Sequence, residues 1–247
     1  MRALLLAAGI GSRLRPLTNT TPKCLVPVHD RPLLDYWLDL VFQGGIERAL
    51  LNTHWLADQV RTHVAASPWH QRIDLVHEDE LLGTGGTVLA NRNWFGTAPF
   101  LVAHADNLTD FDVAGLIAAH RNRPAGCIMT MLAFRTDDPS SCGILELDSQ
   151  NRVLAFHEKV ENPPGNLANG AVYIFEPEVI EDIARLGRPV VDLSTEIIPN
   201  YLGRILSVET DGYHRDIGNP ESLRRAHSEF KHKPRDGGGA GTADTAQ

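Results

Sequence analysis

The sequence predicts an α/β fold, Rossmann-like, in which helices flank a mixed and mainly parallel sheet. Short aliphatic runs alternate with amphipathic segments as far as Phe134, which is typical of βαβ units. Gly9 and Gly11 follow the first aliphatic run directly, as a tight turn after a strand requires. A hairpin pattern within residues 140–175 adds a small antiparallel lobe. We therefore expect one sheet of about seven strands with that lobe beside it.

In the first half, strands are expected where short aliphatic runs lie between turn residues, and helices where the apolar residues have a helical period. The predicted strands are Leu4–Ala7, Arg48–Asn52, Ile73–Glu78, Phe100–His104 and Ile128–Phe134. The predicted helices are Leu33–Phe42, which ends at Gly44-Gly45, then Leu56–Ala66, a helix start at Gly86–Asn91, and Phe111–His120. This alternation implies a mostly parallel sheet.

The second half has a different pattern. Gly143–Asp148 and Arg152–Glu158 are separated by Ser149-Gln150-Asn151, which is typical of a β-hairpin. The elements expected after it are a strand at Asn169–Phe175, helices at Pro177–Arg185 and Ser194–Leu202, strands at Ile205–Thr210 and Tyr213–Asp216, and a last helix with Pro220 in its first turn. Residues 1–230 form one predicted domain, and residues 231–247, which are almost free of apolar side chains, are expected to be disordered.

Composition excludes several classes of protein. Of the 247 residues, 43% are hydrophobic, which is enough for one substantial core. The net charge of −8 argues against a nucleic-acid partner. No apolar run approaches the roughly 20 residues that span a bilayer, and the N-terminal run is interpreted as a buried strand, so we expect a cytoplasmic protein with no membrane contact. Cys24, Cys127 and Cys142 lack paired spacing, which indicates a reducing compartment and no zinc site.

The segment Leu5–Lys23, with the sequence LLAAGIGSRLRPLTNTTPK, is the strongest candidate for a ligand-binding site in the sequence. Backbone N–H groups in its glycine-containing turn suit a phosphate, and Arg13 and Lys23 add cationic donors. The segment is not the dinucleotide fingerprint G-x-G-x-x-G, because Leu14 occupies the place of the third glycine, and this disfavours a Rossmann oxidoreductase. It does not match the P-loop pattern either.

This segment resembles the G-x-G-[ST]-R-L-x-P-L-T…P-K signature of the sugar-1-phosphate nucleotidyltransferases, also called nucleotide-sugar pyrophosphorylases, with Ser12 where threonine is frequent. Further landmarks of that family follow in order as Leu82-Gly83-Thr84-Gly85-Gly86, Asp106, Glu158-Lys159, Asn169-Gly170 and Arg215–Glu221. The chain departs from the family pattern at Ala105 in place of glycine, at Val160 in place of proline, and at His214 or Tyr213 in place of tryptophan. The resemblance spans roughly residues 1–230.

The resemblance implies roles for individual residues. The implied nucleotide-binding residues are Leu6, Ala7, Ala8, Gly9, Gly11, Ser12, Arg13, Lys23, Glu80, Gly83, Thr84, Gly85 and Asp106. The implied sugar-phosphate-binding residues are Gly143, Glu158, Lys159, Asn169 and Gly170. Asp106 and Asp216 would hold Mg²⁺, a hard cation that prefers oxygen ligands. The catalytic set is Arg13 on the leaving pyrophosphate, Lys23 on the α-phosphoryl group, and the two aspartates, while Lys159 would bind the attacking sugar phosphate.

The substrates implied are a nucleoside triphosphate and a sugar 1-phosphate. The small relatives that the chain resembles favour GTP with a mannose or manno-heptose 1-phosphate, for surface polysaccharide synthesis. The missing side chains of Gly85 and Gly86 are expected to leave room for a purine, although a pyrimidine would fit there too. Two alternatives remain at this point: a uridylyltransferase for an N-acetylated sugar such as N-acetylmuramate 1-phosphate, and a regulatory homologue that binds nucleotide sugars without turnover. Homo-oligomerisation is also left open, and the histidines are interpreted as packing or surface residues.

Overall fold

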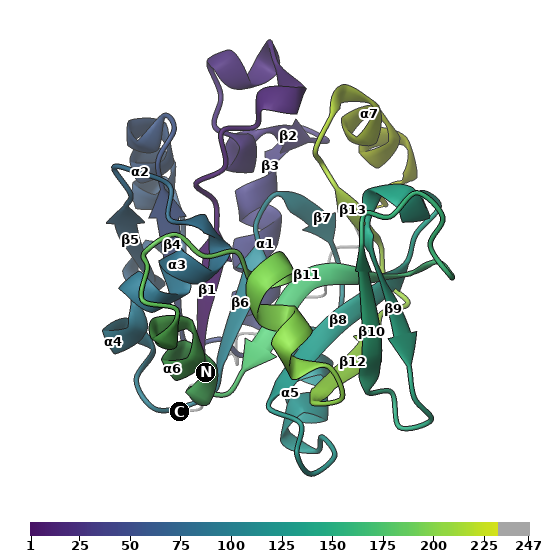
Figure 1. The fold of residues 1–247 in the computed structure, drawn as a ribbon. Coiled ribbons are helices and arrows are strands. Elements are labelled where there is room, and N and C mark those ends of the chain that lie inside the picture. The colour runs from purple at the N-terminus through teal and green to yellow at the C-terminus, as the bar shows by residue number, and fades with distance from the viewer. Residues whose placement is uncertain (232–247) are drawn as a thin grey trace, which may run out of the picture.

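The computed structural model describes residues 1–231, so the predicted tail at 231–247 lies outside the described residues except for Lys231. The main sheet has nine strands (Figure 1). They are β1 (Arg2–Leu6), β4 (Arg48–Thr53), β5 (Ile73–His77), β6 (Phe100–His104), β8 (Met129–Arg135), β9 (Gly143–Leu147), β10 (Val153–Glu158), β11 (Leu167–Phe175) and β12 (Ile205–Glu209). The expectation of about seven strands was therefore too low.

The strand order is β10-β9-β11-β6-β1-β4-β5, and it combines a parallel region with an antiparallel one. In addition, β8 pairs with β11, and β12 pairs with β8. Strands β6, β1, β4 and β5 are parallel, whereas β11 runs antiparallel to β6, β8 and β9. The predicted neighbours pair in register, with Leu5 opposite Ala103 and Leu6 opposite His104. The predicted α/β class is confirmed, and the antiparallel lobe of β9 and β10 is continuous with the main sheet.

The helices cover both faces of the sheet (Figure 1). They are α1 (Leu33–Gln43), α2 (Ala57–Ala66), α3 (Gly83–Ala90), α4 (Arg92–Phe95), α5 (Val113–Arg121), α6 (Glu178–Arg185) and α7 (Pro220–Glu229). Because side chains alternate along a strand, Ala3 and Leu5 of β1 pack in the core under α1, α2 and α5, while Leu4 packs in the core under α3 and α6. None of the helices among residues 1–231 has the length and apolar character needed to cross a membrane.

A third apolar cluster joins α7 and the residues on either side of it to the glycine-containing segment. Leu14 and Val26 pack with Ile217 and with Phe230, which follows α7. Two small sheets lie on this side of the molecule: β2 (Pro27–Val28) with β3 (Arg31–Pro32), and β7 (Asn107–Thr109) with β13 (His214–Asp216). The predicted strand Tyr213–Asp216 thus pairs with β7 and not with the main sheet.

Two predicted helices differ from the structure. Residues 193–201 form a single π-helical turn, Leu193–Ile197, followed by a 3₁₀ turn, Ile198–Tyr201, where a helix at Ser194–Leu202 was expected. Pro199 explains the break, since it has no N–H to donate within an α-helix. Helix α3 begins at Gly83, so Gly83–Gly86 form its first turn and not a loop that precedes it.

Candidate active site

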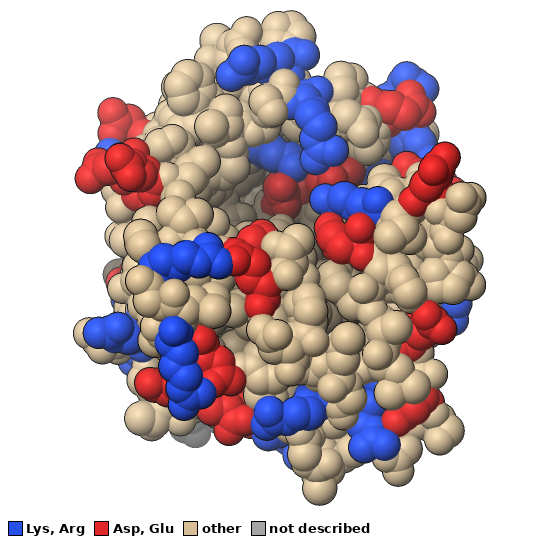
Figure 2. All heavy atoms as spheres, viewed as in Figure 1, with Lys and Arg blue, Asp and Glu red and all other residues tan. Residues whose placement is uncertain are grey.

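The carboxyl ends of the parallel strands open on a cleft, which appears as a hollow rimmed by charged side chains in Figure 2. One pocket of this cleft is lined by Leu6 at the end of β1, Gly9 after it, Asn52 of β4, Glu78 after β5, and the first turns of α3. A second pocket is lined by Arg13, Lys159, residues 134–138 from the end of β8 onward, residues 141–142, and residues 212–216. Asp106 lines the first pocket and Asp216 the second.

The two aspartates are brought together by the small β7–β13 sheet, in which Asp216 pairs with Asn107, the residue after Asp106. The Lys23 ammonium lies between them, with Nζ 2.6 Å from Asp106 Oδ2 and 3.3 Å from Asp216 Oδ1. Arg13 Nη2 lies 3.7 Å from the other oxygen of Asp216. Two carboxylates that are distant in the sequence therefore share one cation in the fold.

The charges of this group depend on one another. Burial by itself would raise the pKa of Asp106, but attraction to Lys23 outweighs it, so the pKa of the carboxyl is lowered. For Lys23, burial opposes the charged form, and the two carboxylates overcome it and raise the pKa of the ammonium. Asp106 and Lys23 are thus both charged at neutral pH.

Two carboxylates around a single cation also suit Mg²⁺, which is bound in proteins through one or two carboxylates, with substrate phosphates and water as the other ligands. Among residues 1–231 no group of three or more His, Cys, Asp or Glu side chains is arranged to hold a metal by itself. The donor set fits an ion that needs oxygen ligands from a bound phosphate.

A buried polar network supports the first pocket. The Asn52 side chain accepts a hydrogen bond from the Ala7 N–H (2.7 Å) and donates to Glu78 Oε1 (2.9 Å). The Thr87 hydroxyl donates to the same Glu78 oxygen at 2.6 Å, and the Leu82 N–H donates to the other at 3.3 Å. The ends of β1, β4, β5 and α3 are held together by this one carboxylate.

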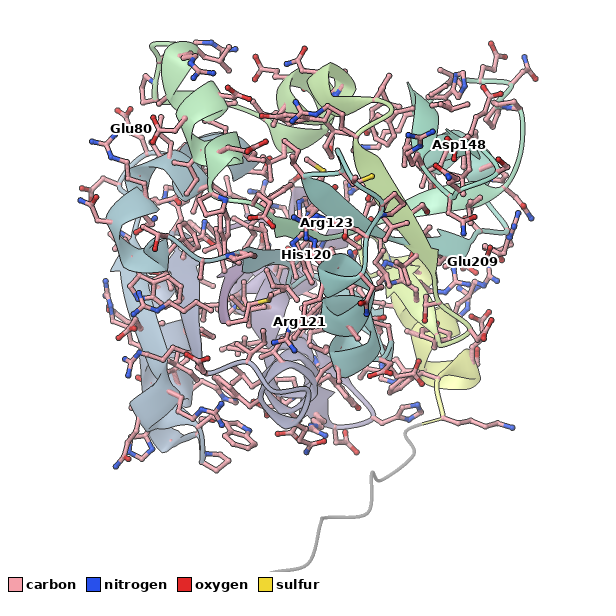
Figure 3. All side chains as sticks on the ribbon, turned by 90° about the horizontal axis from the view of Figure 1, so that it is seen from below. Glu80, His120, Arg121, Arg123, Asp148 and Glu209 are labelled. Carbon is pink, nitrogen blue, oxygen red and sulfur yellow. The ribbon has the colours of Figure 1, made fainter. Side chains whose placement is uncertain are left out.

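Sequence reasoning missed Asn52, Glu78 and Thr87, and chose Glu80, which is exposed and does not line this pocket (Figure 3). A signal was present, because Asn52 and Glu78 are the last residues of two predicted buried strands. Polar groups at those positions lie where ligands bind in α/β sheets.

The glycines of α3 face the protein and not an open space. The Gly85 and Gly86 N–H groups donate to the Val191 carbonyl at 2.8 and 3.1 Å. A Cβ on Gly83 would lie 2.6 Å from that carbonyl oxygen, and a Cβ on Gly86 would lie 2.1 Å from Pro189 O. The missing side chains make room for residues 189–191, so the expectation that Gly85 and Gly86 leave space for a purine was wrong. Gly83 and Thr84 do line the pocket.

The turn after β1 is shaped as the sequence predicts. Gly11 has φ +67°, and a Cβ there would lie 2.9 Å from Thr18 Cγ2. The Thr18 hydroxyl donates to Gly11 O at 2.7 Å, which closes the turn. A short 3₁₀ turn, Ser12–Leu14, follows and presents Arg13 with 71% of its side chain exposed. Gly11 is therefore needed for its backbone conformation and for the close approach of Thr18.

Of the predicted sugar-phosphate residues, Lys159 lines the second pocket, whereas Gly143, Glu158, Asn169 and Gly170 are not among its lining residues. Lys159 follows β10 in a left-handed conformation (φ +50°), its N–H donates to the Cys142 carbonyl, and its ammonium lies 3.3 Å from Glu158. A Cβ on Gly143 would lie 2.6 Å from Glu158 Oε2, so that glycine makes room for the carboxylate. This lysine remains largely exposed.

Asn169 and Gly170 lie where the register of β11 shifts. The Asn169 side chain accepts from the Ala171 N–H at 2.9 Å and donates to the Tyr173 hydroxyl at 2.7 Å. Gly170 lies against the Leu132 carbonyl and the His214 ring.

Tyr213 and His214, the two candidates for the position of the family's tryptophan, both line the second pocket. His214 belongs to β13. Its ring packs on Phe134, with ring centroids 4.4 Å apart, and its Nδ1 lies 3.1 Å from Thr109 Oγ1. Burial lowers the pKa of His214 to about 4, so the ring is neutral. Tyr213 instead packs against Phe230.

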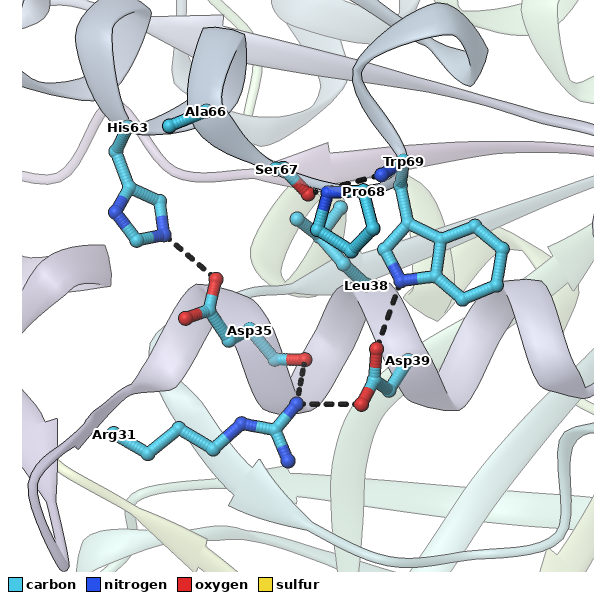
Figure 4. Close-up of a pocket in the computed structure, with 9 residues that line it drawn as sticks. All are labelled: Arg31, Asp35, Leu38, Asp39, His63, Ala66, Ser67, Pro68 and Trp69. Atoms are coloured by element: carbon cyan, nitrogen blue, oxygen red, sulfur yellow. Dashed lines mark hydrogen bonds and ion pairs between the residues drawn. The ribbon is translucent and has the colours of Figure 1, made fainter. Parts of the chain in front are cut away.

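Another hollow, between α1 and residues 63–69, contains none of the predicted site residues (Figure 4). Its charged groups are paired with one another: His63 Nε2 lies 2.6 Å from Asp35, and Arg31 Nη2 lies 2.6 Å from Asp39. The Trp69 indole N–H also donates to Asp39, at 2.8 Å. These contacts join α1 to the end of α2, which is a structural role.

Comparison with known proteins supports the family resemblance of the residues in the cleft. Residues 2–233 match the model of the nucleotidyl transferase family. The chain is 32% identical over 233 residues to mannose-1-phosphate guanylyltransferase of Mycobacterium tuberculosis, covering 92% of this chain and 64% of that protein. It is 30% identical over 228 residues to mannose-1-phosphate guanylyltransferase catalytic subunit beta of Drosophila pseudoobscura pseudoobscura, covering 90% and 60%. The chain thus spans less than two thirds of the length of these two relatives.

Solved structures share the fold. HddC from Yersinia pseudotuberculosis complexed with GMP-PN superposes with a TM-score of 0.78 at 25% identity, covering 93% of this chain and 99% of that one. A UDP-glucose pyrophosphorylase complexed with UDP-glucose has the same TM-score at 20% identity, covering 92% and 97%. With a family match over nearly all its described residues and a cleft built from that family's landmark residues, the chain belongs to the nucleotidyl transferase family.

Proposed function

We propose that the chain transfers a nucleotidyl group from a nucleoside triphosphate to a sugar 1-phosphate, giving a nucleotide sugar and pyrophosphate. The observation that carries this is the Asp106–Lys23–Asp216 group at the boundary between two pockets. The first pocket has glycines and buried polar groups, and the second has the exposed cations Arg13 and Lys159. The named functions of the relatives support the same reaction.

In this reaction an oxygen of the sugar phosphate forms a bond to the α-phosphorus while the bond to the pyrophosphate oxygen breaks. The attacking oxygen is already ionised, so no general base is needed, and the obstacle is repulsion between two polyanions. Arg13 stabilises charge on the leaving pyrophosphate, Lys23 binds the α-phosphoryl group, and Lys159 binds the sugar phosphate. Mg²⁺, when bound by Asp106 and Asp216, supplies further neutralisation of phosphate charge.

Retention of Arg13, Lys23, Asp106 and Asp216 argues against a regulatory homologue without turnover. A cytoplasmic location and a role in surface polysaccharide synthesis belong to the same proposal.

Within this proposal the preferred triphosphate is GTP, and the observation in its favour is Glu78. Its carboxylate is 5% exposed, lines the first pocket and accepts three hydrogen bonds from the protein. A carboxylate has about four lone-pair sites, so it can accept from a ligand as well. Guanine offers adjacent N1–H and N2–H₂ donors, whereas uracil offers one N–H between two carbonyls. The one remaining site favours guanine, because the second donor beside its N1–H also attracts the carboxylate, whereas the two carbonyl oxygens beside the uracil N–H repel it.

The relatives named for mannose 1-phosphate favour a manno-configured sugar, either mannose or manno-heptose 1-phosphate, as the acceptor. The alternative is a uridylyltransferase acting on N-acetylmuramate 1-phosphate. Both substrates are tested together by measuring pyrophosphate release from each of the four triphosphates with a panel of sugar 1-phosphates. We expect GTP with a manno-configured sugar to give the highest kcat/KM. Turnover with UTP or dTTP at least about tenfold better than with GTP, on the same sugar phosphate, would contradict the proposal.

Two substitutions separate the structural assignment from the sequence-based one. Glu78→Gln replaces an acceptor-only group by one that also donates, so it should lower kcat/KM with GTP more than with UTP. Glu80→Gln changes an exposed carboxylate outside the pocket and should leave the GTP-to-UTP ratio as in the wild type. The opposite outcome would assign base recognition to Glu80.

A further inference from the structure

We infer that residues 191–194 form a strap that positions both substrate pockets, with Asp192 and Tyr173 as positioning residues. The strap is defined as Val191, Asp192, Leu193 and Ser194, none of which was predicted as a site residue. It contacts Thr84 of the first pocket on one side and Tyr173, the partner of Asn169, on the other. The inference rests on the proposed function, because it assigns one substrate to each side.

On the nucleotide side, the strap is bonded to the first turn of α3. The Thr84 hydroxyl accepts from the Leu193 N–H at 2.7 Å and donates to Asp192 Oδ2 at 3.2 Å. The Val191 carbonyl accepts from two amides of α3, and the Val191 N–H donates to the Leu82 carbonyl at 3.0 Å. In Figure 1 the segment that follows α6 passes beside α3. Because Gly83 and Thr84 line the nucleotide pocket, their positions are set by this strap.

The strap is itself held firmly. Asp192 Oδ1 accepts from both the N–H and the hydroxyl of Thr195, each at 2.9 Å. The Asp192 N–H donates to Glu196 Oε2 at 2.8 Å, and Arg188 forms an ion pair with Glu196. Asp192 therefore joins the π-helical turn to α3, and its second carboxylate oxygen is directed at Thr84.

On the sugar side, the Ser194 side chain lies beside the Tyr173 hydroxyl. That hydroxyl accepts the Asn169 amide at 2.7 Å, and Tyr173 is fully buried in the same apolar cluster as Val191 and Leu193. Asn169, with its other end fixed by the Ala171 N–H, is thereby held on the side of the cleft that carries Glu158 and Lys159.

One short segment thus contacts Thr84 in the first pocket and the Tyr173–Asn169 pair on the other side of the cleft, where the next residue, Gly170, packs against His214 of the second pocket. A bimolecular displacement requires the attacking oxygen and the phosphorus in near-contact, and misplacement by about 1 Å costs on the order of 100-fold in rate. A strap that is bonded to Thr84 and lies beside Tyr173 ties the two sides of the cleft together. Loss of one hydrogen bond on either side should weaken the ligand on that side only, since the remaining contacts hold the strap.

The test measures dissociation constants by calorimetry for GTP and for mannose 1-phosphate, each alone, with the full chain. Asp192→Asn should weaken GTP about fivefold, the equivalent of one hydrogen bond, and leave mannose 1-phosphate unchanged. Tyr173→Phe should weaken mannose 1-phosphate by a similar factor and leave GTP unchanged. Tyr201→Phe is the matched control, because it removes a hydroxyl that is bonded to Asp182 in the same apolar cluster, and it should change neither constant.

Thr84 gives an independent check if Asp192→Asn folds poorly. Thr84→Val should reproduce the loss of GTP affinity, and Thr84→Ser, which keeps the hydroxyl, should retain it. Variants with a lowered Tm but wild-type dissociation constants would reduce the strap to a structural element and overturn the inference, as would equal weakening of both ligands by either variant. If the wild type binds neither GTP nor mannose 1-phosphate, the proposed function fails first, and the inference fails with it.

Discussion

Lys23 and Lys159 belong to two regions of one cleft, and they are held in opposite ways. The Lys23 side chain is 7% exposed and has two carboxylate partners, whereas that of Lys159 is 65% exposed and has one neighbour, Glu158. The region around Lys23 is built on parallel strands with a buried polar network behind it. The region around Lys159 lies at the end of a hairpin, on a backbone in a left-handed conformation.

The difference indicates that the nucleotide side is organised before any ligand arrives, because its polar groups already satisfy one another. On the sugar side the cation is free to reorient, so ligand binding must order it. A substitution on the nucleotide side should therefore change both the fold's stability and the reaction. One on the sugar side should change ligand affinity alone.

The largest effect is expected at the carboxylates. Asp106→Ala or Asp216→Ala removes a group that holds charge against the phosphates, so kcat should fall by about 1,000-fold, the equivalent of several kcal/mol. Steady-state pyrophosphate release measures this, with melting curves as a check on the fold. Turnover within about tenfold of the wild type in either variant would remove that aspartate from the catalytic group.

Lys23→Met should lower kcat about 100-fold, as loss of a preorganised cation does. It also leaves Asp106 and Asp216 facing each other without a counter-charge, so we expect Tm to fall by about 3–6 °C. Because Mn²⁺ can take the place of the lost ammonium, Mn²⁺ should raise the Tm of the variant more than that of the wild type. Equal shifts in the two proteins would mean that Lys23 and the metal do not compete for these carboxylates.

A smaller effect is expected at His120 of α5 (Figure 3), whose Nε2 lies 3.3 Å from a carboxylate oxygen of Glu176, the residue after β11. His120 is buried, its Nδ1 bonds to the Thr130 hydroxyl, and burial first, then Arg123, lower its pKa to about 4. As the pH falls, His120 of the unfolded chain is therefore protonated at a higher pH than His120 of the folded chain. The stability that depends on the neutral ring is present above pH 6.5 and is lost as pH falls toward 4.

The measurement is urea unfolding at several pH values in that window, on the wild type and His120→Asn. The variant should lose stability less steeply, by up to about 1.4 kcal/mol per pH unit. Identical slopes would assign the acid sensitivity to other groups. Since His120 contacts neither pocket, this result also separates acid unfolding from acid inactivation.

The sequence predicted the parallel region well because its signals are local. The aliphatic runs of β1, β4 and β6 and the turn glycines were identified close to their observed bounds, and the pairing of β1 with β6 follows from βαβ order. The proximity of Asp106 and Asp216 was inferred from the family resemblance, and in the structure the two share Lys23.

What the sequence did not reveal depends on contacts between distant segments. Nothing local shows that Gly83, Gly85 and Gly86 face residues 189–191, or that Val191 accepts two amides of α3. Glu78 was overlooked because a carboxylate at a strand end has the same local pattern whether it is buried in a network or exposed like Glu80. The π-helical turn depends on Asp192 and Glu196 bonding within a segment whose apolar period also fits an ordinary helix.

The central claim, one pocket for each substrate, is tested most directly by KM values for both substrates in two variants of opposite regions. Lys159→Met should raise KM for the sugar 1-phosphate about tenfold, with KM for GTP and the Tm unchanged. Glu78→Gln should raise KM for GTP and leave KM for the sugar 1-phosphate unchanged. If Lys159→Met instead raises KM for GTP, or if both variants raise KM for the same substrate, the division of the cleft is wrong.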